Sequence, residues 1–313
     1  MVIQKHISTR AWSELFLLGV IWGGVFLTAA IALKEIPPFS LVAIRITLAA
    51  LVLWVLALLR HSPIPKGWRT WRALFVMGIL NNAIPFTLLT LGQTQIESGL
   101  TSIFNAGTAV FGILIAAIFL KDERLTHRKL IGVILGISGI IFTVGYESLQ
   151  TFDLRSLGQI ACICATISYA FAGVWARKNL SGLSPDSATA GMLTSAALVT
   201  IPIAFFAEGA PTFSYSLQTW GALLYYVPIA TAFAYLLYFR ILEMAGSANT
   251  LLVTLLVSPV AIALGAVILN ETLPTRAFIG FALIALGLAV IDGRLWKLAR
   301  RTFSTARGSA IPR

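Results

Sequence analysis

Charged residues are scarce in this chain of 313 residues: they make up 11% of it, against roughly a quarter in soluble domains. Apolar residues make up 58%, and the mean hydropathy is +0.88. This composition excludes an ordinary soluble domain and predicts an all-α integral membrane protein whose surroundings are the lipid bilayer. Because each span needs about 20 apolar residues, ten spans would leave only short connections and tails.

Carboxylates are rarer still, with 12 Asp and Glu residues against 23 Lys and Arg residues. Those that fall within apolar stretches, Glu14, Glu97, Glu208 and Asp292, all lie near the ends of those stretches. Ionisable residues in the membrane interior commonly mark ion and proton pathways. Their scarcity in the middle of the predicted spans argues against a proton relay or a sodium site built from carboxylates.

The sequence also lacks a recognisable catalytic or metal-binding set. The three histidines, His6, His61 and His127, lie in polar segments, and no cluster of His, Asp and Glu can be assembled around a metal. A nucleophile with its base, which a membrane-embedded hydrolase would need, is missing as well. Cys162 and Cys164 lie two positions apart in an apolar span, on nearly opposite helix faces, which favours packing over a metal or redox role. We expect no enzymatic activity, no metal and no cofactor.

What the chain does contain is an internal repeat, visible when the sequence is shifted by 148 positions against itself. In each copy a polar loop around a glutamate precedes an apolar stretch, whose two glycines share one helix face that a neighbour can approach closely. Gly19 and Gly23 form a similar pair in the first apolar run and predict tight packing there. The aligned identities are Glu123 with Glu271, Leu125 with Leu273, Arg128 with Arg276, Ile131 with Ile279, Gly132 with Gly280, Gly139 with Gly287 and Gly145 with Gly293.

The repeat divides the chain into two units, 11–146 and 155–293, followed by a basic tail at 294–313. A shift of 147 pairs Trp22 with Tyr169, so the first apolar run has a counterpart and is expected to be retained rather than cleaved as a signal peptide. Five helices per unit is an odd number, so the second unit must enter the membrane from the opposite side, giving inverted repeats. The ten predicted helices cover 12–33, 39–60, 70–92, 97–120, 130–146, 156–177, 185–207, 217–239, 246–269 and 277–293.

The distribution of positive charge predicts the orientation. If the N-terminus is cytoplasmic, the outer loops hold only Lys34, Arg155 and Arg276, and Arg45 lies within a span, which leaves nineteen of the 23 basic residues for the inner segments. Positive residues accumulate in cytoplasmic loops. We therefore expect a multi-pass inner-membrane protein with both termini in the cytoplasm, and we attribute the net charge of +11 to orientation rather than to binding of nucleic acid.

Few polar side chains lie within the predicted spans. Arg45, roughly two turns into the second helix, can anchor a substrate carboxylate or help in gating, or it can be a structural cation bonded to helix-end carbonyls. Asn81 and Asn82 precede Pro85, which frees the carbonyl of Asn81. The two amides can border a water-filled kink or bond to neighbouring helices. Asn105 forms a smaller polar patch in the fourth helix.

Aromatic residues recur at matching depth in the two units. Trp22 and Tyr169 lie mid-span beside a glycine or an alanine, and Tyr235 shares a helix face with Thr231 and Tyr238. Cavity lining is one interpretation of these residues. Membership of an interfacial aromatic belt, where most membrane Trp and Tyr residues lie, is the other.

With these features the chain resembles the EamA family of the drug/metabolite transporter (DMT) superfamily. The resemblance covers 11–293 and is carried by the ten helices in two inverted halves, the doubled Glu-x-Leu loop at Glu123 and Glu271, the opening Ile-Trp-Gly-Gly of residues 21–24, and Arg45. The two units are accordingly read as two EamA-like five-helix repeats.

The two copies differ in one feature of the family pattern. Pro259 matches the usual proline of its helix, whereas Phe111 stands at the equivalent place in the first unit. The resemblance does not therefore imply a fully symmetric pathway.

The resemblance implies a secondary transporter that works by alternating access through a central cavity and often exports amino acids. The narrower likeness is to aromatic amino-acid exporters of the YddG type. An antiporter for phosphorylated or nucleotide-linked metabolites, which would need several cavity cations, and a membrane-embedded enzyme are the alternatives. We expect a small-molecule substrate, and we predict its binding site at Trp22, Arg45, Asn81, Asn82, Asn105, Tyr169 and Tyr235.

Three further expectations follow. With no carboxylate in the middle of a predicted span, we expect weak or no proton coupling. Glu123 and Glu271 are interpreted as structural residues at helix ends rather than as substrate ligands. The oligomeric state is open, because the small-residue faces of the fifth and tenth helices suit internal packing and dimerisation equally.

Overall fold

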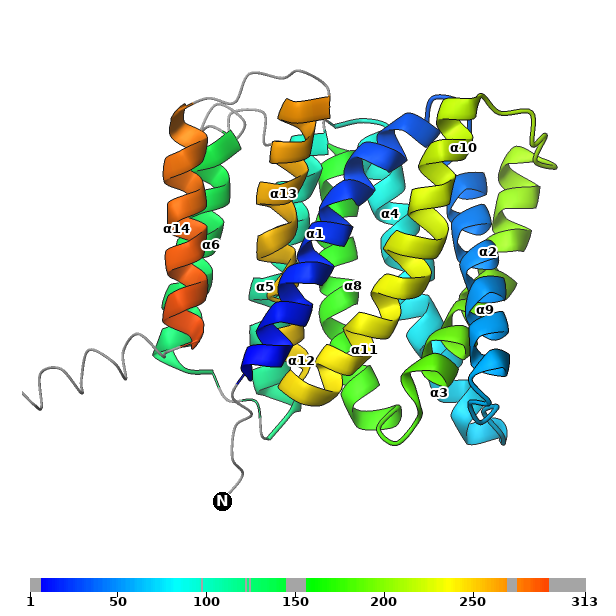
Figure 1. Cartoon of the computed structure of the whole chain (residues 1–313), viewed down its shortest axis with the longest axis horizontal. Coiled ribbons are helices and arrows are strands. Elements are labelled where there is room, and N and C mark those ends of the chain that lie inside the picture. Colours follow the sequence, from blue (N-terminus) through cyan, green and yellow to red (C-terminus); the bar gives the residue numbers. More distant parts are fainter. Residues whose placement is uncertain are drawn as a thin grey trace, which may run out of the picture.

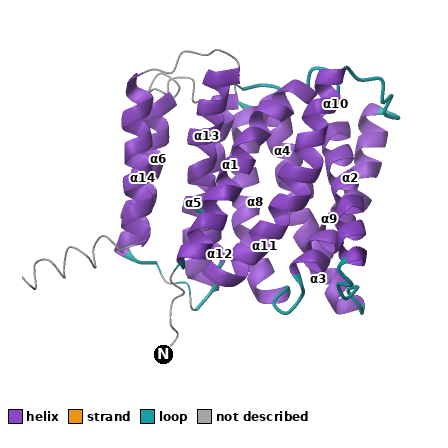
Figure 2. Ribbon diagram, viewed as in Figure 1, coloured by secondary structure: helices purple, strands orange, loops and turns teal. Residues whose placement is uncertain are grey.

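A computed structural model describes residues 7–96, 98–121, 123, 125–144, 156–268 and 275–292. The regular elements of these residues are all helices, and no strand occurs among them (Figure 2). The helices stand side by side, and their loops lie at the two ends of the bundle (Figure 1). The prediction of an all-helical protein is confirmed for this part of the chain, while Glu271 and the tail at 294–313 lie outside the described residues.

Among the described residues, seven helical segments are long and apolar enough to cross a membrane. Two shorter apolar stretches lie within α5 (Ser98–Phe119) and α14 (Thr275–Asp292), and α6 spans His127–Val144. The structure thus describes a membrane protein with several spans, while the number ten stays a prediction. The seven segments are Thr9–Ala32 (α1), Pro38–Leu59 (α2), Trp68–Gln93, Leu157–Asn179 (α8), Pro185–Glu208 (α9), Leu217–Ala245 and Ser247–Leu264.

Three of these segments are composite. Two of them contain a π-helical stretch, in which the backbone bonds from residue i to residue i+5 replace the usual pattern. The third is interrupted by a turn. Their parts are α3 (Trp68–Gly78), η1 (Ile79–Ala83) and α4 (Ile84–Gln93); α10 (Leu217–Leu224), η2 (Tyr225–Phe233) and α11 (Ala234–Ala245); and α12 (Ser247–Thr250) with α13 (Val253–Ile268).

The π-helical stretch η1 occupies the place where the sequence predicts a kink. Pro85 has no N–H to bond the carbonyl of Asn81. That carbonyl instead accepts a hydrogen bond from the hydroxyl of Tyr235, 3.3 Å away in another helix. The freed carbonyl predicted from the sequence is therefore satisfied by a side chain of the second unit.

Helices α2 and α9 pack along each other and are joined at their ends. The carboxylate of Glu208, the last residue of α9, accepts hydrogen bonds from the backbone N–H groups of Phe39 and Ser40 at 3.0 and 2.7 Å. At the other end, Asp186 in the first turn of α9 pairs with Arg60 at 3.0 Å. Carboxylates at helix N-termini satisfy N–H groups that lack partners within the helix. These contacts fix the register between the two helices.

The glycine faces predicted on the fifth and tenth helices meet each other. Helix α6 packs along α14, side by side at one edge of the bundle (Figure 1). A Cβ atom on Gly139 would lie 2.6 Å from the carbonyl oxygen of Gly280, and one on Gly287 would lie 2.8 Å from the backbone nitrogen of Gly136. The predicted close approach is confirmed, and these faces serve internal packing.

The first helix also packs tightly through glycine, as predicted. A Cβ on Gly19 would lie 2.7 Å from the Cβ of Leu256, and Gly23 faces Val260 one turn further on. Both neighbours belong to α13. Helices from the two units are thereby held in direct contact beside the centre of the bundle.

Two predicted helix boundaries are wrong. The helix predicted to end at 239 continues to Ala245, because its buried face continues through Ile241 and Leu242. The single helix predicted over 246–269 is interrupted at residues 251–252. There the backbone hydrogen bonds span three residues instead of four, as in the bond from the N–H of Leu252 to the carbonyl of Asn249 at 3.3 Å. The side chains of Asn249 and Thr250 also bond to backbone carbonyls of the preceding turn.

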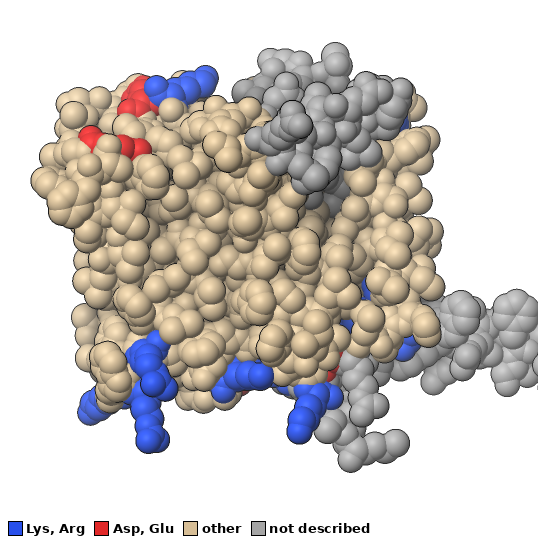
Figure 3. All heavy atoms as spheres, turned by 180° about the vertical axis from the view of Figure 1, so that it is seen from behind, with Lys and Arg blue, Asp and Glu red and all other residues tan. Residues whose placement is uncertain are grey.

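Basic side chains gather at the end of the bundle where α1 begins. The face shown in Figure 3 has Lys and Arg along this edge, with a broad band free of charged residues above it. Such a band is what a protein surface needs in order to contact lipid.

Enlarging Gly139 should destabilise the fold. The Gly139→Ala substitution places a methyl group against the backbone of Gly280, and overpacking of this kind costs about 1–3 kcal/mol. We expect a lower midpoint of thermal unfolding in detergent. Gly221→Ala in α10 is the matched control, because nothing lies within 4 Å of its added Cβ. Equal midpoints for the two variants would contradict the proposed glycine contact.

Candidate functional site

A cavity lies among helices of both units. It extends from mid-bundle, at Tyr238 in α11, towards the end of the bundle where α4 finishes at Gln93. Its described lining residues are Trp22, Val25, Phe26, Arg45, Asn81, Phe86, Leu89, Thr90, Gln93, Asn105, Thr108, Tyr169, Tyr226, Tyr235, Tyr238, Leu251, Thr254 and Val257.

Six of the seven residues predicted from the sequence line this one cavity. Asn82 does not, because its side chain is fully buried behind the cavity wall. The structure thus brings together residues from helices far apart in the sequence; whether they bind a substrate stays a prediction. The six are Trp22, Arg45, Asn81, Asn105, Tyr169 and Tyr235.

Arg45 is the cationic member of the described cavity lining, and its side chain is only slightly exposed. Its Nε donates a hydrogen bond to Oγ1 of Thr231 at 2.7 Å, and its Nη1 donates one to the hydroxyl of Tyr226 at 3.0 Å. The guanidinium carbon lies 3.8 Å from the ring centroid of Phe86 and 4.1 Å from that of Tyr226. Hydroxyl groups and ring faces thus hold this cation, rather than the helix-end carbonyls considered in the structural interpretation.

The π-helical stretch η2 is what brings both hydroxyl partners to Arg45. Tyr226 and Thr231 are five residues apart, which in an α-helix would place them about 140° apart around the axis. In a π-helical turn the backbone bonds from residue i to residue i+5, and the wider turn brings these two residues closer to one face. The Thr231 hydroxyl donates to the Tyr226 carbonyl at 2.7 Å, which fixes its orientation. The irregular backbone therefore positions the groups that bind the cation.

Arg45 keeps hydrogen-bonding capacity for a ligand. A guanidinium has five N–H donors, and two of its nitrogens account for the bonds to Thr231 and Tyr226. Among the described residues no carboxylate pairs with it. A planar guanidinium with free N–H groups at a cavity suits a carboxylate, which can accept two parallel bonds.

Tyr235 organises the wall next to Arg45. Its hydroxyl accepts a hydrogen bond from Nδ2 of Asn82 at 2.7 Å and donates to the Asn81 carbonyl at 3.3 Å. Its ring lies nearly parallel to that of Phe86, with the centroids 6.5 Å apart and an angle of 18°. Asn82 thus bonds between helices, the second of the two roles considered for it.

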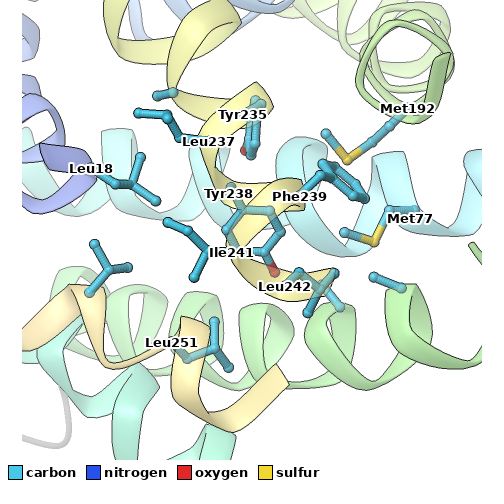
Figure 4. Close-up of a cluster of buried hydrophobic side chains, with 14 of the residues drawn as sticks. Leu18, Met77, Met192, Tyr235, Leu237, Tyr238, Phe239, Ile241, Leu242 and Leu251 are labelled. Atoms are coloured by element: carbon cyan, nitrogen blue, oxygen red, sulfur yellow. The ribbon is translucent and has the colours of Figure 1, made fainter. Parts of the chain in front are cut away.

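Aromatic rings close the inner end of the cavity. The ring of Tyr238 lies 6.0 Å from Trp22 and 6.1 Å from Tyr235. Figure 4 shows Tyr235 and Tyr238 leaving α11 within a cluster that includes Leu18 and Met192. Trp22 is held by a hydrogen bond of 3.1 Å from its Nε1 to the Ala230 carbonyl in η2. The result is an aromatic surface that fits a flat or apolar ligand body.

Two buried hydroxyl groups at the cavity have no partner in the described part of the chain. They belong to Thr108 and Tyr238, whose side chains are almost completely buried. Buried polar groups normally form hydrogen bonds, so these hydroxyls are available to a ligand or a water molecule. Asn105, one helical turn before Thr108 on α5, adds an amide to the same lining.

Sequence reasoning missed some lining residues, among them Thr90 and Gln93. They follow Phe86 by four and seven positions, which places all three on one face of α4. This spacing was readable in the sequence. No residue of the predicted site lies on this face of α4, so the sequence offered no reason to choose it.

Glu123 lies outside the described cavity lining and caps a helix. Its two carboxylate oxygens accept hydrogen bonds from the backbone N–H groups of Ser247 and Ala248, each at 2.7 Å, at the start of α12. The guanidinium of Arg177 lies 3.9 Å away. Glu123 therefore joins the loop before α6 to the second unit, which agrees with the structural role expected for it.

The chemistry of the cavity is that of binding. Among the described residues no group of three or more His, Cys, Asp or Glu residues is placed to hold a metal ion. The described lining combines one cation with amides, hydroxyls and aromatic rings. These groups can recognise a small molecule that carries a carboxylate and an apolar body.

The known proteins that this chain is similar to include transporters. The chain is 26% identical to the probable amino-acid metabolite efflux pump of Escherichia coli, over 90% of this chain and 95% of that protein. It is 21% identical to the uncharacterized transporter YoaV of Bacillus subtilis, over 86% of this chain and 92% of that protein. A solved crystal structure with 19% identity has a TM-score of 0.75 and covers 90% of this chain and 97% of its own, which shows a shared fold.

The model of the EamA-like transporter family matches residues 12–145 and again residues 156–292. Because these two matches together take in most of the sequence, the chain belongs to the EamA-like transporter family and is a membrane transporter rather than an enzyme.

Proposed function

We propose that this protein is a secondary transporter that exports small metabolites by alternating access through the cavity around Arg45. Amino acids with aromatic or other neutral side chains are the first candidates. The observation that carries this proposal is the buried guanidinium of Arg45, stacked on two rings and presenting free N–H groups to the cavity. A charged residue within the membrane is costly, and a functional site is its usual explanation. The probable amino-acid metabolite efflux pump among the relatives agrees with this substrate class.

The architecture we propose is ten spans in two inverted EamA-like repeats, 11–146 and 155–293. The helix order supports it, because each family match contains five helical segments. The π-helical stretches support it too: each lies in the third segment of its unit, and the 148-residue shift places 79–83 within 225–233. With both termini in the cytoplasm, the basic end of the bundle would face inward, in agreement with the positive-inside rule.

In this orientation the cavity extends towards the outer side and is closed towards the cytoplasm. Glu14 pairs with Arg10 and Arg240 at the cytoplasmic end, and Glu123 caps α12 at the same end. An exporter that works by alternating access must break contacts between helices when it opens inward. We therefore expect Glu14 to separate from Arg240, and Glu123 from the start of α12, in the inward-open state, whereas the Arg10–Glu14 pair lies within α1 and can persist.

Phosphorylated metabolites fit the cavity less well. A phosphate group carries more negative charge than a carboxylate and is usually bound by several cations. Arg45 is the one Lys or Arg residue in the described lining. An antiporter of sugar phosphates or nucleotide-linked metabolites is therefore the second candidate, and the transport experiment tests it.

The test is uptake by liposomes that contain the purified protein. The labelled panel holds aromatic and aliphatic amino acids, a purine and a sugar phosphate. Saturable uptake of amino acids alone would support the proposal. Uptake of the sugar phosphate alone would replace it with the antiporter, and a panel that is not transported at all would refute it.

Replacing Arg45 should abolish most of this uptake. Loss of a charge-assisted hydrogen bond costs about 1.5–3 kcal/mol, so Arg45→Ala should lower kcat/KM by about tenfold or more. Arg45→Lys keeps the charge but loses the planar fork and the stacking, so its kcat/KM should lie between those of the wild-type protein and Arg45→Ala. Lys66→Ala, which removes an exposed cation outside the cavity, is the control. Full activity in Arg45→Ala would exclude the site.

Uptake should not depend on an imposed pH gradient. The described cavity lining offers no carboxylate that could carry a proton. We expect equal initial rates in liposomes with and without a transmembrane pH difference, measured at the same external pH. Abolition of uptake when the gradient is collapsed by an ionophore would show proton coupling and contradict this expectation.

A further inference from the structure

We propose that the cavity binds monoanionic carboxylates with an aromatic body more tightly than it binds zwitterionic amino acids. The ligands in question are 2-hydroxy and 2-oxo acids, in which a neutral group replaces the ammonium group. This inference rests on the proposed function, because it specifies the substrate class of the same cavity.

The balance of charge is the first argument. Arg45 brings one positive charge to the described lining, and no Asp or Glu of that lining offsets it. A monoanion bound to Arg45 brings the site to neutrality. A zwitterion contributes no net charge and leaves its ammonium group buried without a carboxylate partner. Buried ions are costly unless they are paired and hydrogen-bonded.

The position of the ammonium group is the second argument. A carboxylate bonded to a guanidinium lies about 2.8 Å from the donor nitrogen. The ammonium group of an amino acid, on the carbon atom next to the carboxylate, is then held close to the guanidinium of Arg45. Two like charges at such a distance, in surroundings of low polarity, repel each other far more than they do in water. A hydroxyl or oxo group at the same carbon atom avoids this repulsion.

The neutral groups of the cavity are the third argument. The hydroxyls of Thr108 and Tyr238 have no partner in the described part of the chain, and each can donate as well as accept. The amide of Asn105 can do the same. A 2-hydroxyl group can use both capacities, and a 2-oxo group can accept, whereas an ammonium group has three donors and needs acceptors only.

Aromatic rings do not replace the missing carboxylate. Trp22, Tyr235 and Tyr238 contact one another at centroid separations of 6.0 to 6.2 Å. An aromatic ring can attract a cation, and Phe86 and Tyr226 contact Arg45 in this way. The rings are uncharged, so a contact of this kind would leave an ammonium group without a counter-ion. The rings therefore suit the apolar body of the ligand.

The deciding experiment compares two probes with the same carbon skeleton, phenylalanine and 3-phenyllactate, on the purified wild-type protein. Kd is obtained by competition in detergent, and uptake is measured in liposomes. We expect the Kd of phenyllactate to be lower by about tenfold, as for relief of one unpaired buried charge.

Equal or tighter binding of phenylalanine would overturn this inference, and transport of phenylalanine would leave the proposed function in place. If the protein neither bound nor transported either probe, both proposals would fail.

A variant tests the charge argument directly. Asn105→Asp keeps the side-chain size and gives an ammonium group a carboxylate in the cavity, so the preference should shift from phenyllactate towards phenylalanine. Asn179→Asp is the matched control, because it adds the same charge at an exposed position near the end of α8 and should leave the preference unchanged. A thermal shift with each probe shows that both variants are folded. An unaltered preference in folded Asn105→Asp would refute the charge account.

Discussion

The arrangement of the cavity follows from the cost of keeping one guanidinium away from water. Arg45 is almost fully buried in a bundle whose composition is overwhelmingly apolar. Two hydroxyl groups and two ring faces stabilise it, and all four are uncharged. Neutral partners lower the cost of burial but do not cancel the charge. The charge of Arg45 is therefore not balanced by its described partners, which favours binding of an anion.

Helix geometry in the second unit meets this requirement through a π-helical stretch. A regular helix would point Tyr226 and Thr231 in different directions, and only one of them could reach Arg45. The wider π-helical turn brings them closer to one face and leaves backbone carbonyls without their usual partners. The indole of Trp22, from another helix, satisfies one of these carbonyls, that of Ala230. The stretch thus serves both the cation and the contact between the two units.

The sequence predicted the parts of this protein that depend on local rules. The missing N–H of Pro85 predicted a free carbonyl at Asn81, and in the structure this carbonyl accepts a hydrogen bond from Tyr235. The spacing of Gly132 and Gly139 predicted a close helix contact, and both glycines lie against α14. The sequence also predicted Asn82 at the binding site, whereas the structure shows the amide of Asn82 bonded to Tyr235 and outside the described cavity lining. Both asparagines lie in η1, where α-helical spacing no longer tells which face a residue occupies. The presence of the π-helical stretches depends on contacts between distant segments, which no local spacing encodes.

In each unit a side chain donates a hydrogen bond to a backbone carbonyl of the other unit. Trp22 of the first unit donates to the Ala230 carbonyl in η2, and Tyr235 of the second donates to the Asn81 carbonyl in η1. Both donors line the cavity, and both acceptors belong to irregular backbone. A ligand that displaces either ring therefore removes a partner from a buried carbonyl, which costs free energy unless the backbone changes register. Displacement of either ring would in this way couple occupancy of the cavity to the geometry of the two irregular helices.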